Sequence, residues 1–266
     1  MPIEPDLPGG VPERGTGAAS SGRRVLTFER VDSTNEVAWR EAERGVPEWT
    51  WVSADEQTGG RGRLSRRWHS PAGLGVWTSV VLRPGVTPSV APGITMCASL
   101  AVARTLRKLH PMSVSLKWPN DVMVKGRKIC GILTEMKASG ERVEFVVCGI
   151  GINLNQAAED FPAELRDAAT SVFLETGHKA DKAEALAELM PQMERVYAVF
   201  LSNGLQALMG EWRSMCPLFG KIVRMKTRGE TVEGVFHDID ASGALVLRLE
   251  SGVHRSFLAG DVEPVS

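Results

Sequence analysis

The sequence predicts an α+β fold, in which a mixed β-sheet flanked by helices is followed by a small SH3-like β-barrel. Between residues 24 and 216, strand-like runs alternate with amphipathic helical segments, which indicates one large layered domain. After residue 216 the runs are short and strand-like throughout, with Arg-Gly and Ser-Gly turns between them, as in small barrels. The 266 residues suffice for both parts. We therefore predict a domain large enough to be catalytic over 24–216 and a barrel over 217–266.

The N-terminal segment differs in composition from the rest of the chain. Residues 1–22 contain four prolines and five glycines and almost nothing that could be buried. We predict a disordered tail over 1–23, followed directly by the first strand. A helix is expected next, because Ser33 and Glu36 have capping-box spacing and Gly45 stands where a helix would end.

The remaining elements follow from hydrophobic periodicity. Apolar residues at every third or fourth position predict helices, whereas alternating or continuous apolar runs predict strands. Gly126 and Gly140 mark tight turns between strands. The predicted helices cover 93–109, 181–201 and 204–215, and the predicted strands cover 51–54, 76–82, 113–118, 121–125, 129–137 and 142–152.

Composition and charge exclude several classes of protein. Lys and Arg number 31 against 32 Asp and Glu, and this net charge of −1 argues against a protein that mainly holds DNA or RNA. No apolar run approaches the ~20 residues that span a bilayer, and the N-terminus lacks the pattern of a secretory signal. We expect a cytoplasmic protein without a membrane contact. Its widely spaced cysteines predict reduced, mostly buried thiols and no metal site: Cys97, Cys130, Cys148 and Cys216.

The most unusual stretch is the loop 59–73, with the sequence GGRGRLSRRWHSPAG. Four arginines fall within seven residues, among glycines and just before Trp68: Arg61, Arg63, Arg66 and Arg67. Glycine lets a backbone approach a ligand closely, guanidinium groups pair with carboxylates or phosphates, and an aromatic face can stack on a base. The composition alone leaves three interpretations open: an anion-binding loop, a solvated basic loop, or an RGG-like contact with nucleic acid.

A second group of polar residues lies within 117–132, where Lys117, Asn120, Asp121 and Lys128 are set among strand-forming residues. The Trp-Pro-Asn-Asp sequence predicts a turn, because Pro fixes φ and Asn or Asp can bond the following backbone. We expect Lys117 and Lys128 on neighbouring strands that face one cleft. An exposed hairpin without a ligand is the alternative.

A third element, CGIGINLNQ at 148–156, combines glycines with Asn153. The glycines allow another segment to pack closely against this strand, and a side-chain amide fits the edge of an adenine. The Gly-x-Gly is not a dinucleotide-binding fingerprint, because no third glycine opens a helix after it.

Together these motifs resemble the biotin protein ligase family over about residues 25–265. The matching residues occur in the family's order and rough spacing: Ser33-Thr34-Asn35, Gln57 with Gly60-Arg61-Gly62-Arg63, Lys117-Trp118-Pro119-Asn120-Asp121, Lys128 with Gly131, and Gly149-Ile150-Gly151-Ile152-Asn153. One departure is Ser65, where the family usually has glycine. The resemblance implies a catalytic domain of the class II synthetase and SH2-like kind. It implies the monofunctional form, because about two dozen residues before that domain are too few for the winged-helix repressor domain of bifunctional members.

The resemblance also implies the activity. Such a ligase activates biotin with ATP and Mg²⁺ to biotinyl-5′-AMP and transfers biotin to a lysine of a biotin carboxyl carrier domain, forming a C–N bond. It implies that Lys128, between the biotin carboxylate and the phosphate, and Arg63 are catalytic. The implied biotin-binding residues are Ser33, Thr34, Asn35, Gln57, Arg61, Gly62, Arg63, Lys128 and Gly131. The implied nucleotide-binding residues are Trp68, Lys117, Asn120 and Asn153. No residue is assigned to a metal.

Two other functions remain as alternatives. A lipoate ligase-like acyltransferase would share the fold, but we expect it to lack both the Gly-Arg-Gly-Arg loop and the C-terminal barrel. A nucleic-acid-binding module would use the arginine loop, but the net charge of −1 and the lack of a second basic cluster oppose it. A homodimer through sheet edges is a further option that the sequence leaves open.

Overall fold

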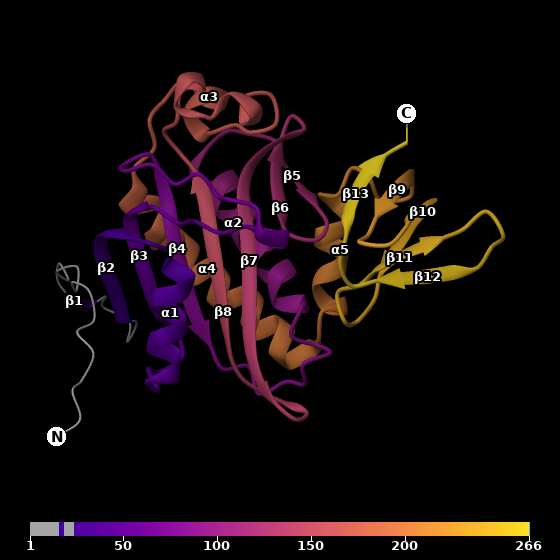
Figure 1. Ribbon diagram of the computed structural model, residues 1–266. Coiled ribbons are helices and arrows are strands. Elements are labelled where there is room, and N and C mark those ends of the chain that lie inside the picture. The colour runs from indigo at the N-terminus through magenta and orange to yellow at the C-terminus, as the bar shows by residue number, and fades with distance from the viewer. Residues whose placement is uncertain (1–15, 19–23, 266) are drawn as a thin grey trace.

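A mixed eight-stranded sheet forms the centre of the molecule in the computed structural model, which describes residues 16–18 and 24–265 (Figure 1). Its strand order is β1-β2-β3-β4-β8-β7-β6-β5. Only β2 and β3 pair in parallel, and the other neighbours are antiparallel. The strands are β1 (Thr16–Ala18), β2 (Arg24–Val31), β3 (Thr50–Gln57), β4 (Gly75–Leu82), β5 (Val114–Lys117), β6 (Asp121–Val124), β7 (Arg127–Ser139) and β8 (Arg142–Asn153). The mixed sheet was predicted and is confirmed.

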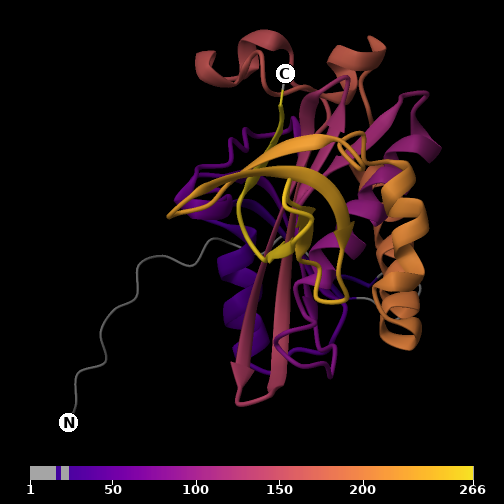
Figure 2. The same ribbon diagram turned by 90° about the vertical axis from the view of Figure 1, so that its right-hand side faces the viewer.

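Helices cover both faces of this sheet. The short helix α1 (Thr34–Glu43) packs on β3, β4 and β8, while α2 (Gly93–Leu109) and α4 (Lys182–Asn203) pack on the opposite face (Figure 2). The helix α5 (Gln206–Ser214) follows α4, and α3 (Val172–Thr176) lies at the end of the sheet where β8 finishes. Single 3₁₀ turns occur at Arg63–Ser65, Ala158–Asp160 and Ala163–Leu165.

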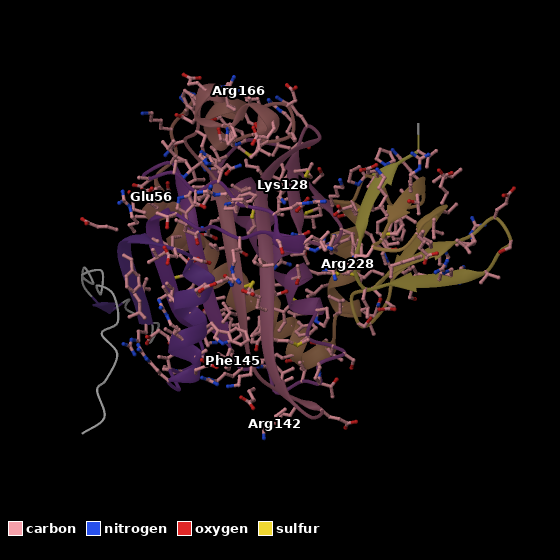
Figure 3. The ribbon with its side chains drawn as sticks, viewed as in Figure 1. Glu56, Lys128, Arg142, Phe145, Arg166 and Arg228 are labelled. Atoms are coloured by element: carbon pink, nitrogen blue, oxygen red, sulfur yellow. The ribbon has the colours of Figure 1, made fainter. Side chains whose placement is uncertain are left out.

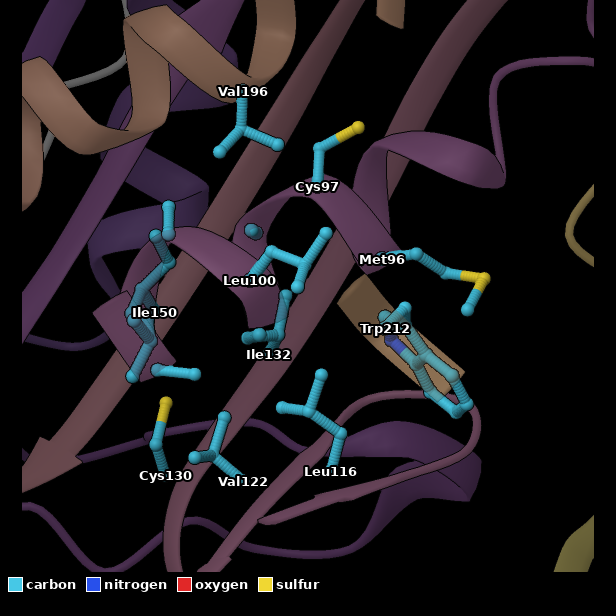
Figure 4. Close-up of a cluster of buried hydrophobic side chains, with 14 of the residues drawn as sticks. Met96, Cys97, Leu100, Leu116, Val122, Cys130, Ile132, Ile150, Val196 and Trp212 are labelled. Carbon is cyan, nitrogen blue, oxygen red and sulfur yellow. The ribbon is translucent and has the colours of Figure 1, made fainter. Parts of the chain in front are cut away.

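Two apolar cores result from these layers. The larger core fills the space between the sheet and α2, α4 and α5, where Leu100, Ile132 and Trp212 are fully or almost fully buried (Figure 4). The smaller core lies under α1, whose Val37 and Ala38 contact Val147 and neighbouring strand residues. Because the sheet is covered on both faces, its central strands are apolar on both sides, and β4 is buried along its whole length.

The C-terminal residues form a second, five-stranded antiparallel sheet with the order β12-β11-β10-β9-β13. Its strands are β9 (Ile222–Lys226), β10 (Thr231–Ile239), β11 (Leu245–Arg248), β12 (His254–Phe257) and β13 (Asp261–Pro264). Its buried residues Val223 and Phe236 belong to the larger core, so the two sheets share one apolar interior. The antiparallel sheet is confirmed, whereas its closure into an SH3-like barrel stays a prediction.

Two local predictions are wrong. Residues 16–18, placed in the disordered tail, form β1 and pair with β2 from Thr16 opposite Leu26 to Ala18 opposite Arg24, while the rest of that tail lies outside the described residues. Ser33 is the N-cap of α1, but its side chain makes no capping hydrogen bond. Its backbone carbonyl accepts from Val37 instead, which leaves the hydroxyl for other partners.

The four thiols are free and buried, as expected. Within 16–18 and 24–265, no helix has the length and apolar character needed to cross a membrane.

Candidate functional site

A cleft of about 370 Å³ opens where four parts of the chain meet. They are the loop 59–73, called the arginine loop below, the strands β5–β7, the segment 161–169 and the strand β13. Six of its lining side chains are basic: Arg61, Arg63, Arg66, Arg67, Lys117 and Lys128. Asp121, Asp261 and Glu263 are its carboxylates, and Phe161 and Leu165 contribute apolar wall. The excess of cations in a partly apolar cavity suits an anionic ligand with an apolar or aromatic part. We call it the large cleft.

Lys128 reaches the large cleft because of an irregularity in the strand pairing. The register between β6 and β7 shifts after Val122, so that Ile129 and Cys130 both enter the core although they are adjacent. Such a bulge re-aims the side chains beside it, and Lys128, labelled in Figure 3, lines the large cleft. Its ammonium lies 2.5 Å from Asp121 Oδ1 and 5.3 Å from the centre of the Trp68 ring.

The backbone around Lys128 is fixed by the segment that follows β8. The Lys128 N–H donates to Ala168 O at 2.8 Å, and the Thr170 N–H donates to Lys128 O at 2.9 Å. The nearly fully buried carboxylate of Glu175, in α3, accepts from the Thr170 hydroxyl and from Arg127. The strand that carries Lys128 is thus bonded on both sides near the cleft.

The arginine loop folds back on itself across the cleft. Gly62 N–H donates to Arg66 O at 2.7 Å, and Leu64 and Ser65 between them both adopt left-handed backbone, with φ of 56° and 60°. Arg63 donates to Asn120 Oδ1 and to Gly260 O, each at 3.2 Å, and Arg66 pairs with Asp261. Burial lowers the pKa of the Arg63 guanidinium, while Asp261 and Asp121 oppose that shift.

Trp68 separates the large cleft from a second, much smaller pocket, and its side chain lines both. The indole rests on Gly131 and Gly151: a Cβ at Gly151 would lie 2.3 Å from Trp68 Nε1, and one at Gly131 would lie 2.9 Å from the ring. The glycines of β7 and β8 therefore make room for this ring. Its buried Nε1 has no hydrogen-bond partner among the described residues.

The small pocket, of about 30 Å³, is enclosed by a network of polar side chains. Gln57 Oε1 accepts from the Thr34 backbone N–H at 2.8 Å and from the Thr34 hydroxyl at 3.0 Å, and Gln57 Nε2 donates to Ser70 Oγ at 2.8 Å. Ser33, Asn35 and Arg61 complete the polar lining. The predicted residues Ser33, Thr34, Asn35 and Gln57 are thus brought together, although β3 and α1 supply them from different parts of the chain.

The two predicted asparagines of the large cleft have protein partners. Asn120 Nδ2 donates to Ile132 O at 2.9 Å, and its Oδ1 accepts from Arg63. Asn153 Nδ2 donates to Thr170 O at 3.0 Å, and its Oδ1 accepts from Gln156. Both line the cleft, but their amides also hold neighbouring segments in place, so their contact with a nucleotide stays a prediction.

Lys117 also lines the large cleft, but its position differs from the expectation. It was expected on a strand next to that of Lys128, whereas β6 lies between β5, which carries Lys117, and β7, which carries Lys128. The short β6 and the bulge in β7 allow both side chains to line one cleft despite the extra strand.

Several residues of the site were missed from the sequence. Ser79, fully buried on β4, lies 2.6 Å from Asn35 Oδ1 and 2.7 Å from Thr34 Oγ1, and its only signal is a hydroxyl within an apolar strand. From the sequence, Asp121 fits a turn former or a partner of magnesium or lysine, and it is not among the predicted catalytic residues. The apolar wall at 161–169 and the carboxylates of β13 carry no local signal, because only the tertiary fold brings them to the cleft.

Comparison with known proteins gives the family. A model described as the biotin/lipoate A/B protein ligase family matches residues 27–153, and one described as the biotin protein ligase C terminal domain matches residues 218–263. The chain is 37% identical to the bifunctional ligase/repressor BirA of Bacillus spizizenii, over 91% of this chain and 74% of that protein. It is 38% identical to the biotin–[acetyl-CoA-carboxylase] ligase of Paracoccus denitrificans, over 84% of this chain and 93% of that protein.

A solved structure is similar as well. The biotin protein ligase from Aquifex aeolicus in complex with biotin and ATP matches with a TM-score of 0.77 and 29% identity, over 90% of this chain and 97% of that one. The ordered motifs, the two adjoining cavities and these likenesses lead to one conclusion: the chain belongs to the biotin protein ligase family.

Proposed function

We propose that this chain activates biotin with ATP to biotinyl-5′-AMP and then transfers biotin to a lysine of a biotin carboxyl carrier domain. The observation that carries the proposal is the arrangement of the site. A small pocket lined by hydroxyls and amides adjoins a large basic cleft, and Lys128 and Trp68 lie at their boundary. A neutral polar head group and an anionic nucleotide fit these two environments respectively.

The polar head of biotin is assigned to the small pocket. Its urea-like group needs both donors and acceptors, and Ser33, Thr34, Asn35 and Gln57 supply hydroxyls and amides that can act as either. Arg61, Gly62 and Gly131 would border the chain that leads to the carboxylate. Analogues lacking one polar atom should bind poorly, because they would leave a pocket group without a partner.

Biotin requires Trp68 to shift. A pocket of about 30 Å³ holds roughly one water molecule, far less than a bicyclic ring. The Trp68 indole closes the passage between the two cavities, so it moves outward when biotin enters and is then available to cover the adenine. Its unpartnered Nε1 means that leaving this position breaks no hydrogen bond.

Lys128 and Arg63 are assigned to the first step, in which the biotin carboxylate attacks the α-phosphate of ATP and pyrophosphate leaves. Two anions must approach each other, and fixed cations lower the cost of that approach. Lys128 would stand between the two groups, and Arg63, held by Asn120 and Gly260, would hold the phosphate. Lys117, Asn120 and Asn153 would contact the nucleotide.

Mg²⁺ fits the site only when it is bound together with ATP. Within the described residues no group of three ligating side chains exists, but Asp121 Oδ1 is buried and, apart from its ion pair with Lys128, accepts no hydrogen bond. Mg²⁺ is usually held by one or two carboxylates together with phosphate oxygens. Asp121 would hold the ion, which would neutralise the triphosphate charge.

We place the catalytic domain at 24–216 and an SH3-like barrel at 217–266, and we assign the chain to the cytoplasm. A homodimer through a sheet edge is compatible with the position of β1 and β5 as the end strands of the large sheet. The shared apolar core and the contact of Trp118 Nε1 with Gly243 O at 2.9 Å support a fixed placement of the two parts.

The experiment is mass spectrometry of a carrier domain after incubation with this chain, biotin, ATP and Mg²⁺. The proposal expects one biotin on one lysine and none without ATP. Replacing biotin by lipoate or octanoate tests the acyltransferase alternative, which expects transfer of those acids instead. A gel shift with DNA or RNA at physiological salt tests the nucleic-acid alternative, and no shift is expected.

A further inference from the structure

Glu135, on β7, joins two residues that the proposed function assigns to biotin. Its Oε2 accepts from Asn35 Nδ2 at 2.8 Å and from Arg61 Nη2 at 2.8 Å. Asn35 belongs to α1 and Arg61 to the arginine loop, so one carboxylate oxygen of the sheet connects a helix start with a loop. Glu135 itself does not line either cavity.

The first contact sets the orientation of the Asn35 amide. A carboxylate accepts only, so it selects the NH₂ end of the amide, which also donates to Leu133 O at 3.2 Å. The Asn35 Oδ1 then lies beside the Ser79 hydroxyl at 2.6 Å and directly over Gly149, where a Cβ would lie 2.0 Å away. Without Glu135, the NH₂ end of the amide would keep only the longer bond to Leu133 O, at 3.2 Å.

The second contact holds the beginning of the arginine loop. The Arg61 guanidinium lies between Glu135 and Glu36, whose Oε1 is 3.5 Å from Arg61 Nη1. At the far side of the cleft, Arg66 pairs with Asp261. The loop is therefore attached at one end to α1 and β7 and at the other to β13, and the Arg61 charge is already compensated by protein carboxylates.

We propose that Glu135 is a positioning residue for biotin recognition, which fixes the Asn35 amide and holds the arginine loop at Arg61 with the same oxygen. This inference rests on the proposed function in assigning the pocket to biotin. The inference goes beyond that function because it names a residue, outside both cavities, that decides how tightly biotin is held. By the same geometry, Arg61 mainly attaches the loop to the rest of the protein. Its charge is not free to bind the nucleotide.

Glu135→Gln tests the ionic half of the proposal, since a glutamine can still accept from Asn35 but carries no charge for Arg61. The matched control is Glu43→Gln. Glu43 of α1 pairs with Lys137 of β7 at 3.2 Å, so this change breaks an ion pair of β7 that does not involve the arginine loop. Glu135→Leu removes both contacts. Thermal unfolding of each variant checks that it is folded.

Two measurements are made on the full chain. The first is the rate of trypsin cleavage within 61–67 without any ligand. For Glu135→Gln we expect a rate about five-fold above wild type that depends less on salt than the wild-type rate, as for the loss of one of several partly exposed ion pairs. The second is biotin-dependent ATP–pyrophosphate exchange. The KM for biotin should rise about five-fold in Glu135→Gln and about a hundred-fold in Glu135→Leu, with kcat within about three-fold of wild type in Glu135→Gln.

Wild-type cleavage and a wild-type KM for biotin in Glu135→Gln would overturn the proposal, as would equal changes in Glu43→Gln. A fall in kcat without a change in KM would also overturn it, because positioning of the biotin pocket acts on binding. If wild-type protein shows no biotin-dependent exchange, the proposed function fails, whereas the cleavage rates still test the attachment of the loop.

Discussion

Lys128 shows how a single position depends on its surroundings. Its sequence neighbourhood also fits an exposed hairpin, but the bulge in β7 turns it toward the cleft and places it 2.5 Å from Asp121. The Trp68 ring and the neighbouring Gly131 limit the space around its ammonium. A compact ammonium fits there, whereas the larger planar guanidinium of arginine does not.

We therefore predict that Lys128→Met and Lys128→Arg both lower biotin-dependent ATP–pyrophosphate exchange by at least about a hundred-fold, equivalent to about 2.7 kcal/mol of transition-state stabilisation. Lys137→Met is the control, because Lys137 lies on the same strand and pairs with the exposed Glu43. It should stay within about two-fold of wild type. Exchange at the wild-type rate in Lys128→Met would refute the role of Lys128, and full activity in Lys128→Arg would show that charge suffices.

Ser65 is the position at which this loop departs from the family pattern. Its φ of 60° is in the left-handed region, where glycine is unstrained and an L-residue costs roughly 1–2 kcal/mol. Leu64 has a similar φ, so the turn contains two such residues in succession. Serine thus adopts here, with added strain, a backbone conformation that glycine adopts without strain.

This strain gives a second prediction. Ser65→Val should open the turn, because a branched Cβ is a severe misfit at positive φ, and tryptic cleavage within 61–67 should become several-fold faster. Ser65→Gly should not accelerate it, since the left-handed conformation is retained without the steric cost. Equal cleavage of both variants would show that the turn does not depend on this backbone angle.

At the scale of elements, the glycines of β8 determine what can lie on the sheet. Along Gly149 and Gly151 the strand presents bare backbone to Asn35 and Trp68, so α1 and the arginine loop can approach the sheet directly. These side chains come from segments on either side of β3 in the chain. Without the glycines, the small pocket and the large cleft would be separated from the sheet by a layer of side chains.

We predict that Gly151→Ala raises the KM for both biotin and ATP by more than about ten-fold, since the added Cβ would occupy the small pocket that Gly151 lines and would clash with Trp68 Nε1 at 2.3 Å. Gly210→Ala, on the exposed face of α5 with nothing within 4 Å, is the matched control. It should be fully active and up to about 1 kcal/mol more stable. Steady-state kinetics and thermal unfolding of both variants make the test, and an unchanged KM in Gly151→Ala would contradict it.

At the scale of the whole molecule, the C-terminal sheet contributes to both the core and the cleft. Val223 and Phe236 extend the apolar cluster that holds Trp212, and Asp261 and Gly260 hold two arginines of the loop. The two parts of the chain are therefore joined by apolar packing and by the polar contacts of the site.

Ending the chain at Cys216 should accordingly cause aggregation or loss of activity, because it uncovers apolar surface and frees Arg63 and Arg66. Solubility, thermal unfolding and pyrophosphate exchange of this shortened chain check the prediction. Asp261→Asn separates the two effects: it should keep the fold and accelerate tryptic cleavage of the loop. An active, monomeric chain ending at Cys216 would show that the sheet is dispensable.

The buried thiols give a prediction on pH. Burial raises the pKa of Cys148 to about 12 and that of Cys216 to about 11, and it raises those of Cys97 and Cys130 as well. Because the folded pKa values lie above the ordinary value of 9.0, this contribution to stability is present below about pH 9 and is lost as pH rises through 11 to 12. At pH 8, Ellman's reagent should find no fast thiol before unfolding and four afterwards, and one rapidly reacting thiol in the folded chain would contradict this.

Local sequence pattern sufficed for the elements whose periodicity is strong. The helix at 93–109 and the long hairpin turning at Gly140 follow from spacing that the structure reproduces. The resemblance to the biotin protein ligases also predicted which residues gather around the small pocket and the large cleft.

Other features depend on contacts between segments distant in the chain, so no local pattern contains them. The pairing of β1 with β2, the bulge that aims Lys128, the position of Trp68 between two cavities and the link from Glu135 to Asn35 and Arg61 are of this kind. Ser33 shows the difference within one residue: its spacing from Glu36 indicates a capping side chain, yet the structure leaves that side chain to the small pocket. Periodicity reports which face of an element is apolar, whereas packing against the rest of the molecule decides what each polar group on that face meets.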